Sequence, residues 1–195
     1  MTNDRIPRRG FVLGSLALMV SGCNSIDWPI GPALAARSDY VAPRYRKTRV
    51  RYEGYEPAGT IVVNTEARYL YYVEGGGWAT RYGVGVGEDG RTLKGVATVG
   101  RKAEWPSWTP TADMIRRKPE YEQYAGGVSG GPHNPLGASA LYLYRNGRDT
   151  LFRLHGTNAP WTIGQAVSSG CIRLTNDDIV DLYARTPVGT TVLVI

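Results

Sequence analysis

The stretches Thr60-Ile61-Val62-Val63-Asn64 and Tyr69-Leu70-Tyr71-Tyr72-Val73 decide the fold class of this sequence. Both are rich in β-branched and aromatic residues, which favour pleated strands. The residues between them are turn-like. Gly75-Gly76-Gly77 then interrupts the chain, and Ala79–Val86 predicts a third strand. This region therefore predicts consecutive short strands.

Further runs of the same kind follow along the chain. Short strands at close spacing, separated by Gly, Pro and Asn, are typical of a β-sandwich or a rolled sheet. We therefore expect a mainly β fold, a β-sandwich or rolled mixed sheet, with one or two short helices. The additional predicted strands are Ala97–Val99, Leu141–Tyr144, Thr150–Leu154 and Thr191–Ile195.

Two segments have helical features. Asn176–Arg185 places apolar residues on one face, follows Thr175 as a natural N-cap, and ends before Pro187. A shorter helix is predicted over Thr111–Lys118, because Pro119 stops it. The shorter helix lies inside an irregular stretch, residues 105–137, framed by tryptophans, prolines and glycines. A long insertion of this kind in a small domain predicts a lid-like loop.

The N-terminal residues 1–36 have the features of an export signal. Arg8 and Arg9, followed by Phe11, resemble a twin-arginine signal, and an ordinary secretory signal is the alternative. The apolar run Phe11–Val20 is too short to span a bilayer, which needs about 20 residues. We therefore expect an exported, periplasmic protein.

Two processing sites compete within this region. Val20-Ser21-Gly22-Cys23 resembles a lipobox, in which Cys23 would carry a lipid anchor to the membrane. Ala33-Leu34-Ala35 has the pattern of signal peptidase cleavage, which would remove Cys23. We favour lipidation, because the second site lies far from the apolar run.

The net charge of +6 is concentrated near the N-terminus. Residues 37–53 carry six basic and two acidic side chains, so the basicity belongs to a tether and not to a nucleic-acid-binding face. We interpret residues 37–58 as a basic linker and residues 59–195 as the folded domain. The linker is either simply solvated or lies against anionic lipid or wall polymer.

The catalytic candidates are Cys171 and His155. Either processing route leaves Cys171 as the free thiol in an oxidising compartment, where an idle cysteine is a liability. A nearby imidazole can take the thiol proton and hold the thiolate as an ion pair, which then attacks a carbonyl carbon. Gly156 allows a backbone carbonyl to lie near the His155 ring and set its tautomer.

Neighbouring residues complete a substrate pocket. Gly170 allows backbone N–H groups near Cys171 to approach an oxyanion. Arg173 shares a face with Cys171 on an extended segment and suits a substrate carboxylate. The alternative for Cys171 is an inert core thiol. His133 competes with His155 for the role of base. A metal site formed by His133, His155 and Cys171 would lack a fourth ligand, so we expect neither a metal nor a cofactor.

The residues around His155 and Cys171 resemble those of a known family, the L,D-transpeptidases with a YkuD-type catalytic domain. His155-Gly156-Thr157 and Ser168-Ser169-Gly170-Cys171-Ile172-Arg173 look like its signature. Gly131-Pro132, Asn134-Pro135-Leu136-Gly137 and Pro160-Trp161-Thr162-Ile163-Gly164 resemble its flanking motifs, so that the similarity runs from Gly59 to Ile195.

The resemblance implies an enzyme of peptidoglycan synthesis. Cys171 would be the nucleophile and His155 the base, with Ser169, Gly170 and Arg173 in the pocket motif. Many members have histidine where this chain has Ser169. The substrate would be a tetrapeptide stem that loses D-Ala, and the acceptor a stem amine or a lysine of an outer-membrane protein. A hydrolase of the same fold and a non-catalytic peptidoglycan-binding lipoprotein are the alternatives.

Overall fold

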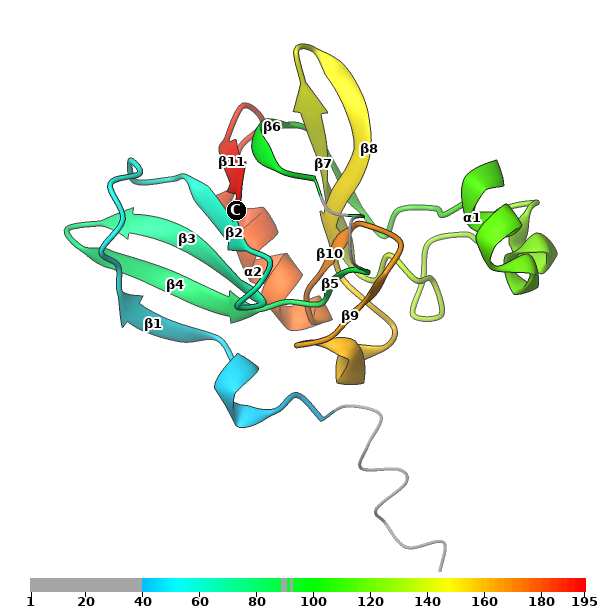
Figure 1. Ribbon diagram of the computed structural model, residues 1–195, viewed down its shortest axis with the longest axis horizontal. Helices are drawn as coiled ribbons and strands as arrows, with labels where there is room; N and C mark the ends of the chain where they lie inside the picture. The colour runs from blue at the N-terminus through cyan, green and yellow to red at the C-terminus, as the bar shows by residue number, and fades with distance from the viewer. Residues whose placement is uncertain (1–39, 89–90, 92) are drawn as a thin grey trace, which may run out of the picture. The chain divides into compact units, whose positions relative to one another are not determined.

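The computed structural model describes residues 40–88, 91 and 93–195. Within them, nine strands form one mixed sheet in the order β1-β4-β3-β2-β11-β6-β7-β8-β10, and β5 pairs with β9 in a small second sheet (Figure 1). The expected mainly β fold is confirmed. The strands are β1 Thr48–Arg51, β2 Ile61–Asn64, β3 Tyr69–Gly75, β4 Trp78–Gly83, β5 Val86–Gly87, β6 Gly95–Glu104, β7 Ser139–Arg145, β8 Arg148–His155, β9 Ala166–Ser168, β10 Ile172–Arg173 and β11 Thr191–Val194.

Strand β11 lies in the middle of the large sheet. It pairs in parallel with β2 and antiparallel with β6, so that it joins the half containing β1–β4 to the half containing β6–β8. The β-branched residues that predicted these strands fill the core: Ile61, Val63 and Val192 are fully buried. Burial of such side chains contributes about 1.5–3 kcal/mol each.

Helix α2, Asn176–Arg185, has the bounds that the sequence predicts. The Thr175 hydroxyl accepts a hydrogen bond from the backbone N–H of Asp178 at 3.1 Å, which satisfies one of the otherwise unpaired donors of the first turn. Ile179 and Leu182 on its inner face are fully buried, and the helix packs against β7 and β8. The predicted cap and amphipathic face are both confirmed.

The 105–137 segment, which we call the lid segment, is ordered by its own contacts. It contains α1, Ala112–Arg117, and the 3-10 helix η3, Pro119–Tyr124, and Figure 1 shows both set off from the sheet. The Trp108 N–H donates to the Val128 carbonyl at 2.9 Å, with a return bond of 2.7 Å. Trp108 also packs against two tyrosines of η3, Tyr121 and Tyr124.

Part of the expected linker is a strand. Residues 48–51 form β1, which pairs antiparallel with β4. The guanidinium groups of Arg49 and Arg51 lie 4.4 and 4.1 Å from the centre of the Trp78 ring, an arrangement that favours a cation over an aromatic face. Charge alone predicts a solvated tether, whereas these arginines pack onto the domain.

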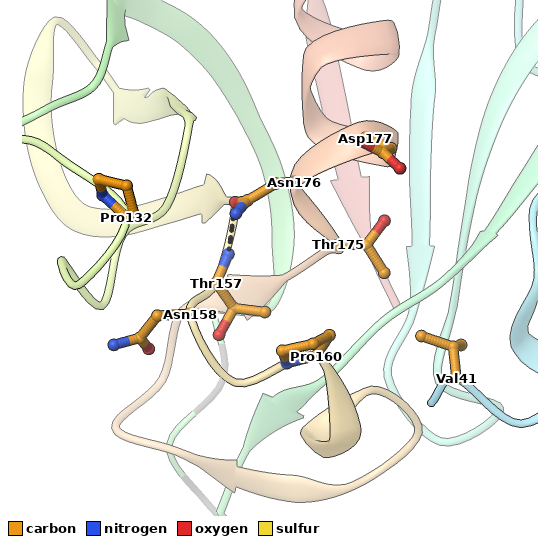
Figure 2. A pocket seen from close by; sticks show the side chains of 8 residues that line it. All are labelled: Val41, Pro132, Thr157, Asn158, Pro160, Thr175, Asn176 and Asp177. Carbon is orange, nitrogen blue, oxygen red and sulfur yellow. Dashed lines mark hydrogen bonds between the residues drawn. The ribbon is translucent and has the colours of Figure 1, made fainter. Parts of the chain in front are cut away.

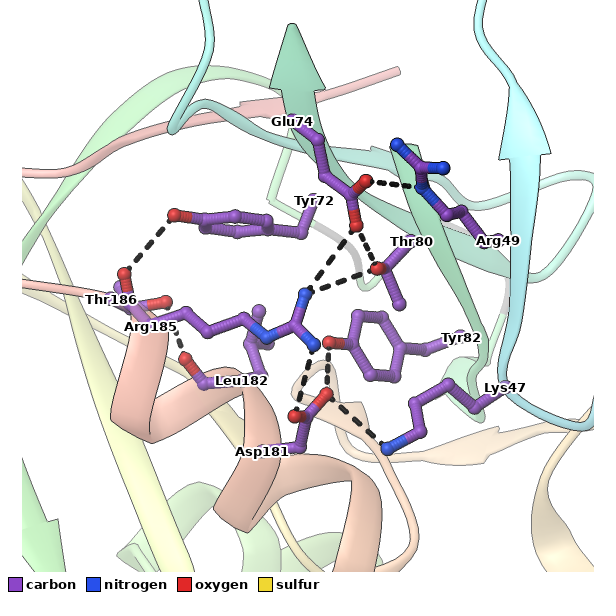
Figure 3. A network of polar contacts seen from close by, with 10 residues as sticks. All are labelled: Lys47, Arg49, Tyr72, Glu74, Thr80, Tyr82, Asp181, Leu182, Arg185 and Thr186. Carbon is purple, nitrogen blue, oxygen red and sulfur yellow. Dashed lines mark hydrogen bonds and ion pairs between the residues drawn. The ribbon is translucent and has the colours of Figure 1, made fainter. Parts of the chain in front are cut away.

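A polar network ties this edge of the sheet to α2 (Figure 3). Asp181 accepts a hydrogen bond of 2.6 Å from the Tyr82 hydroxyl and pairs with Arg185 at 3.2 Å and with Lys47 at 3.4 Å. Glu74 forms the matching ion pair with Arg49 at 2.7 Å. Every charge in this network has an opposite partner, which is typical of structural ion pairs.

The interpretations of residues 1–36, including twin-arginine export and lipidation at Cys23, lie outside the described residues. Within residues 40–88, 91 and 93–195, no helix is long and apolar enough to cross a membrane.

Candidate active site

Parallel pairing of two short strands brings the candidate residues together. Strand β10 lies beside β8, with Arg173 opposite His155 and Ile172 opposite Leu154. The Leu174 N–H donates to the His155 carbonyl at 2.8 Å, which extends this pairing. The nucleophile candidate, Cys171, immediately precedes β10. The two halves of the motif are therefore neighbours in space.

The His155 ring is buried, with 4% of the residue exposed. Its Nδ1 lies 2.5 Å from the Gly156 carbonyl oxygen. Since a carbonyl only accepts, we assign the proton to Nδ1, which leaves Nε2 as the base. Burial, reinforced by the nearby Arg173 charge, lowers the pKa of His155 to about 3. The imidazole is therefore neutral at rest.

The Cys171 side chain is partly buried, with Sγ 3.9 Å from the Leu151 carbonyl oxygen. Burial raises the pKa of the thiol, although a hydrogen bond from the Arg153 backbone and the charges of Arg153 and Arg173 oppose it. The thiol is therefore also neutral at rest. Residue type alone predicts a thiolate–imidazolium ion pair, whereas burial disfavours both charges.

The turn before Cys171 is shaped by Ser168 and Gly170. The Ser168 hydroxyl donates to the Cys171 carbonyl at 2.6 Å and accepts from the Gly170 N–H at 3.1 Å. Gly170 has φ 134°, and a Cβ there would lie 2.6 Å from the Arg91 carbonyl oxygen, so only glycine fits. The Gly170 N–H is engaged within the turn, which the sequence did not reveal. Ser169, another pocket candidate, is partly buried beside it.

Arg173 combines burial with an unsatisfied donor. Its Nε is buried and has no hydrogen-bond partner among the described residues. Burial lowers the pKa of the guanidinium, while Tyr121 of the lid segment and Cys171 favour its charge. A buried unpaired donor is costly, so this side chain is suited to an anionic ligand.

Leu151 belongs to the site, although its sequence pattern does not identify it. It has φ 64°, rare for a leucine, and is 66% exposed. The Asp149 carboxylate accepts its N–H at 2.8 Å, at an irregularity in the β7–β8 pairing. The result aims the Leu151 carbonyl at the Cys171 thiol. No local sequence pattern signals such a bulge.

His133, the competing base, is exposed, and its carbonyl accepts a hydrogen bond from the Asn158 amide at 2.9 Å. Among the described residues, no group of three or more His, Cys, Asp and Glu side chains is placed to hold a metal ion.

An open pocket of about 470 Å³ lies beside the turn that follows His155 (Figure 2). Cys171 does not line it. The lining residues are Val41, Pro132, Thr157, Asn158, Pro160, Thr175, Asn176 and Asp177.

Most of the chain resembles a known family of catalytic domains. The family model of the YkuD L,D-transpeptidase catalytic domain matches residues 58–194. The chain belongs to the L,D-transpeptidase family. It is 43% identical over 139 residues to the probable L,D-transpeptidase ErfK/SrfK of Escherichia coli, a match that covers 69% of this chain and 43% of that protein. The chain thus matches less than half the length of this relative.

Other relatives of this L,D-transpeptidase family member differ in coverage. The putative L,D-transpeptidase YqjB of Bacillus subtilis is 35% identical over 185 residues, covering 94% of this chain and 84% of that protein. A crystal structure from Brucella melitensis, named a probable carnitine operon oxidoreductase, is 47% identical with a TM-score of 0.54 and covers 80% of this chain and 96% of its own. That name describes the Brucella protein; the family model and the curated relatives carry the assignment.

Proposed function

We propose that this protein is a cysteine-dependent L,D-transpeptidase that acts on peptidoglycan tetrapeptide stems. Cys171 is the nucleophile and His155 the base. The observation that carries the proposal is the β8–β10 pairing, which places a thiol, an imidazole and an unpaired guanidinium at one corner of the sheet. An inert core thiol would have no use for an imidazole and a guanidinium beside it.

Because both partners are neutral at rest, the proton moves during attack. As Cys171 Sγ bonds to the carbonyl carbon before the terminal D-Ala, its proton passes to His155 Nε2. The amide C–N bond then breaks, the same proton goes to the departing D-Ala nitrogen, and a thioester remains. An acceptor amine attacks the thioester, loses a proton through His155, and Sγ leaves and is reprotonated.

The surrounding groups stabilise charge along this path. Since the Gly170 N–H is bonded to Ser168, we assign the oxyanion contact to the Cys171 N–H. Arg173 binds a substrate carboxylate, which gives its buried Nε a partner. Burial around the neutral pair also strengthens these contacts, because the local dielectric is low.

The proposed setting is the periplasm after export, with a lipid anchor at Cys23 favoured over cleavage after Ala35. The acyl acceptor is a diaminopimelate amine of another stem or a lysine of an outer-membrane protein. The mature N-terminus, measured by intact mass, distinguishes an anchored from a released enzyme.

The test is incubation of the purified protein with a tetrapeptide muropeptide, with and without an amine acceptor, followed by mass spectrometry. We expect a thioester adduct on Cys171, release of D-Ala and cross-linked product. Cys171→Ala should give none of these and remain folded. Tripeptide alone, even with acceptor present, would favour hydrolysis over transfer. Binding without any D-Ala release would overturn the catalytic assignment.

A further inference from the structure

The side chain of Asn176, the first residue of α2, holds the turn that follows His155. Its Oδ1 accepts hydrogen bonds from the backbone N–H groups of Thr157 at 3.2 Å and Ala138 at 3.0 Å. Figure 2 shows the bond to Thr157 beside the open pocket. One amide oxygen thus ties α2 to both the start of β7 and the end of β8.

Two glycines make room for this oxygen. A Cβ at Gly137 or at Gly156 would collide with Asn176 Oδ1. Gly137 also has φ 63°, a conformation that favours glycine. The glycine after His155 therefore has a specific cause, since any side chain there would displace the asparagine.

Because the peptide bond is planar, the contact between Asn176 and Thr157 also orients the carbonyl that faces the His155 ring. The Gly156 carbonyl and the Thr157 N–H belong to one rigid plane and point in opposite directions. With the Thr157 N–H held by Asn176, the Gly156 carbonyl is directed at His155 Nδ1, 2.5 Å away. On its other side, the Gly156 N–H is fixed to the Ser139 carbonyl at 3.0 Å.

We propose that Asn176 is a positioning residue that sets the tautomer of His155 through the Gly156–Thr157 peptide plane. Without its oxygen the plane can rotate, Nδ1 loses its acceptor, and the proton is shared between the two ring nitrogens. The effect on reaction rate rests on the proposed function, whereas the effect on the ring does not.

The experiment compares nitrogen-15 NMR spectra of the imidazoles in the wild type, Asn176→Ala and Asn176→Asp. The chain has two histidines, so His133→Gln assigns the signals of His155. We expect Nδ1–H in the wild type and a tautomer mixture in Asn176→Ala, with acylation slower by about 10- to 100-fold. Asn176→Asp keeps an oxygen acceptor and should restore the wild-type tautomer. It should also raise the imidazole pKa through its added negative charge.

Asp177→Ala is the matched control. Asp177 is exposed, lines the same pocket and makes neither contact, so its loss should leave tautomer and acylation rate unchanged. A folded Asn176→Ala with the wild-type tautomer overturns the proposal. If that variant does not fold, Asn176→Gln decides, because it displaces the oxygen: an unchanged tautomer overturns the proposal and a mixture supports it. Absence of acyl-enzyme in the wild type would defeat the proposed function while the ring spectra still decide this inference.

Discussion

The polar network between β1, β3, β4 and α2 contrasts with the corner between β8 and β10. In the network, Arg49, Glu74, Asp181 and Arg185 are charged and each has an opposite partner. At the corner, burial holds the thiol and the imidazole neutral, and the Arg173 Nε has no partner among the described residues. The charges of the network are satisfied within the fold, whereas the buried groups at the corner have no opposite charge beside them and stay available to a substrate.

The sharpest way to break this contrast is to remove one titratable group from each region. His155→Gln should slow acylation of Cys171 by about 100- to 10,000-fold, because it removes the base. Asp181→Asn, in the network, should leave the acylation rate unchanged. The measurement is the rate of adduct formation by mass spectrometry. Equal losses in both variants would erase the distinction between the two regions.

The second difference is in the pH dependence of stability. The unfolded chain protonates His155 below pH about 6.5, but the folded protein resists this until its pKa of about 3. The unfolding free energy should therefore fall as pH decreases through this window, by up to about 1.4 kcal/mol per pH unit. His155→Gln should remove this slope between pH about 6.5 and 4.5. The exposed His133→Gln serves as control and should retain it.

Relief of backbone strain should have a smaller effect on the free energy of unfolding than the titration of His155. Leu151→Gly relieves the positive φ beside the thiol and should raise the unfolding free energy by about 1 kcal/mol while slowing acylation. Asn146→Gly relaxes another positive φ, 51°, in the β7–β8 turn and should leave acylation unchanged. Chemical denaturation together with adduct kinetics tests both. Faster acylation in Leu151→Gly would show that the strain has no catalytic use.

The network provides an effect on stability of similar size. Although burial alone would raise the pKa of Asp181, the Tyr82 hydroxyl, Arg185 and Lys47 hold it below its usual value. The stability that this carboxylate contributes is present above pH about 4 and lost as pH falls further. Asp181→Asn should therefore cost about 1 kcal/mol at pH 7 and nothing well below the folded pKa. Denaturation curves at both pH values measure the difference.

Local features were predictable, and long-range ones were not. The bounds of α2 follow from Thr175 and the spacing of Ile179 and Leu182, all close in sequence. Local pattern does not predict strand β1, because its arginines resemble those of a solvated tether. The residues that they contact, Trp78 and Glu74, lie far along the chain.

The same division applies to the site. Residue type and motif resemblance identified Cys171 and His155 as candidates. Their neutral state depends on burial, the bulge at Leu151 depends on strand pairing, and the contacts of Asn176 join three separate elements. Local sequence patterns carry none of this information, because it depends on contacts between residues far apart in the chain.

The central position of β11 has a consequence for how the protein is made. Strands β2 and β6 have no direct pairing with each other, and both depend on residues 191–194. A chain emerging from the ribosome therefore cannot close its sheet until more than a hundred residues after β2 have been synthesised. Until then two strand edges stay open, and an open strand edge can pair with another chain.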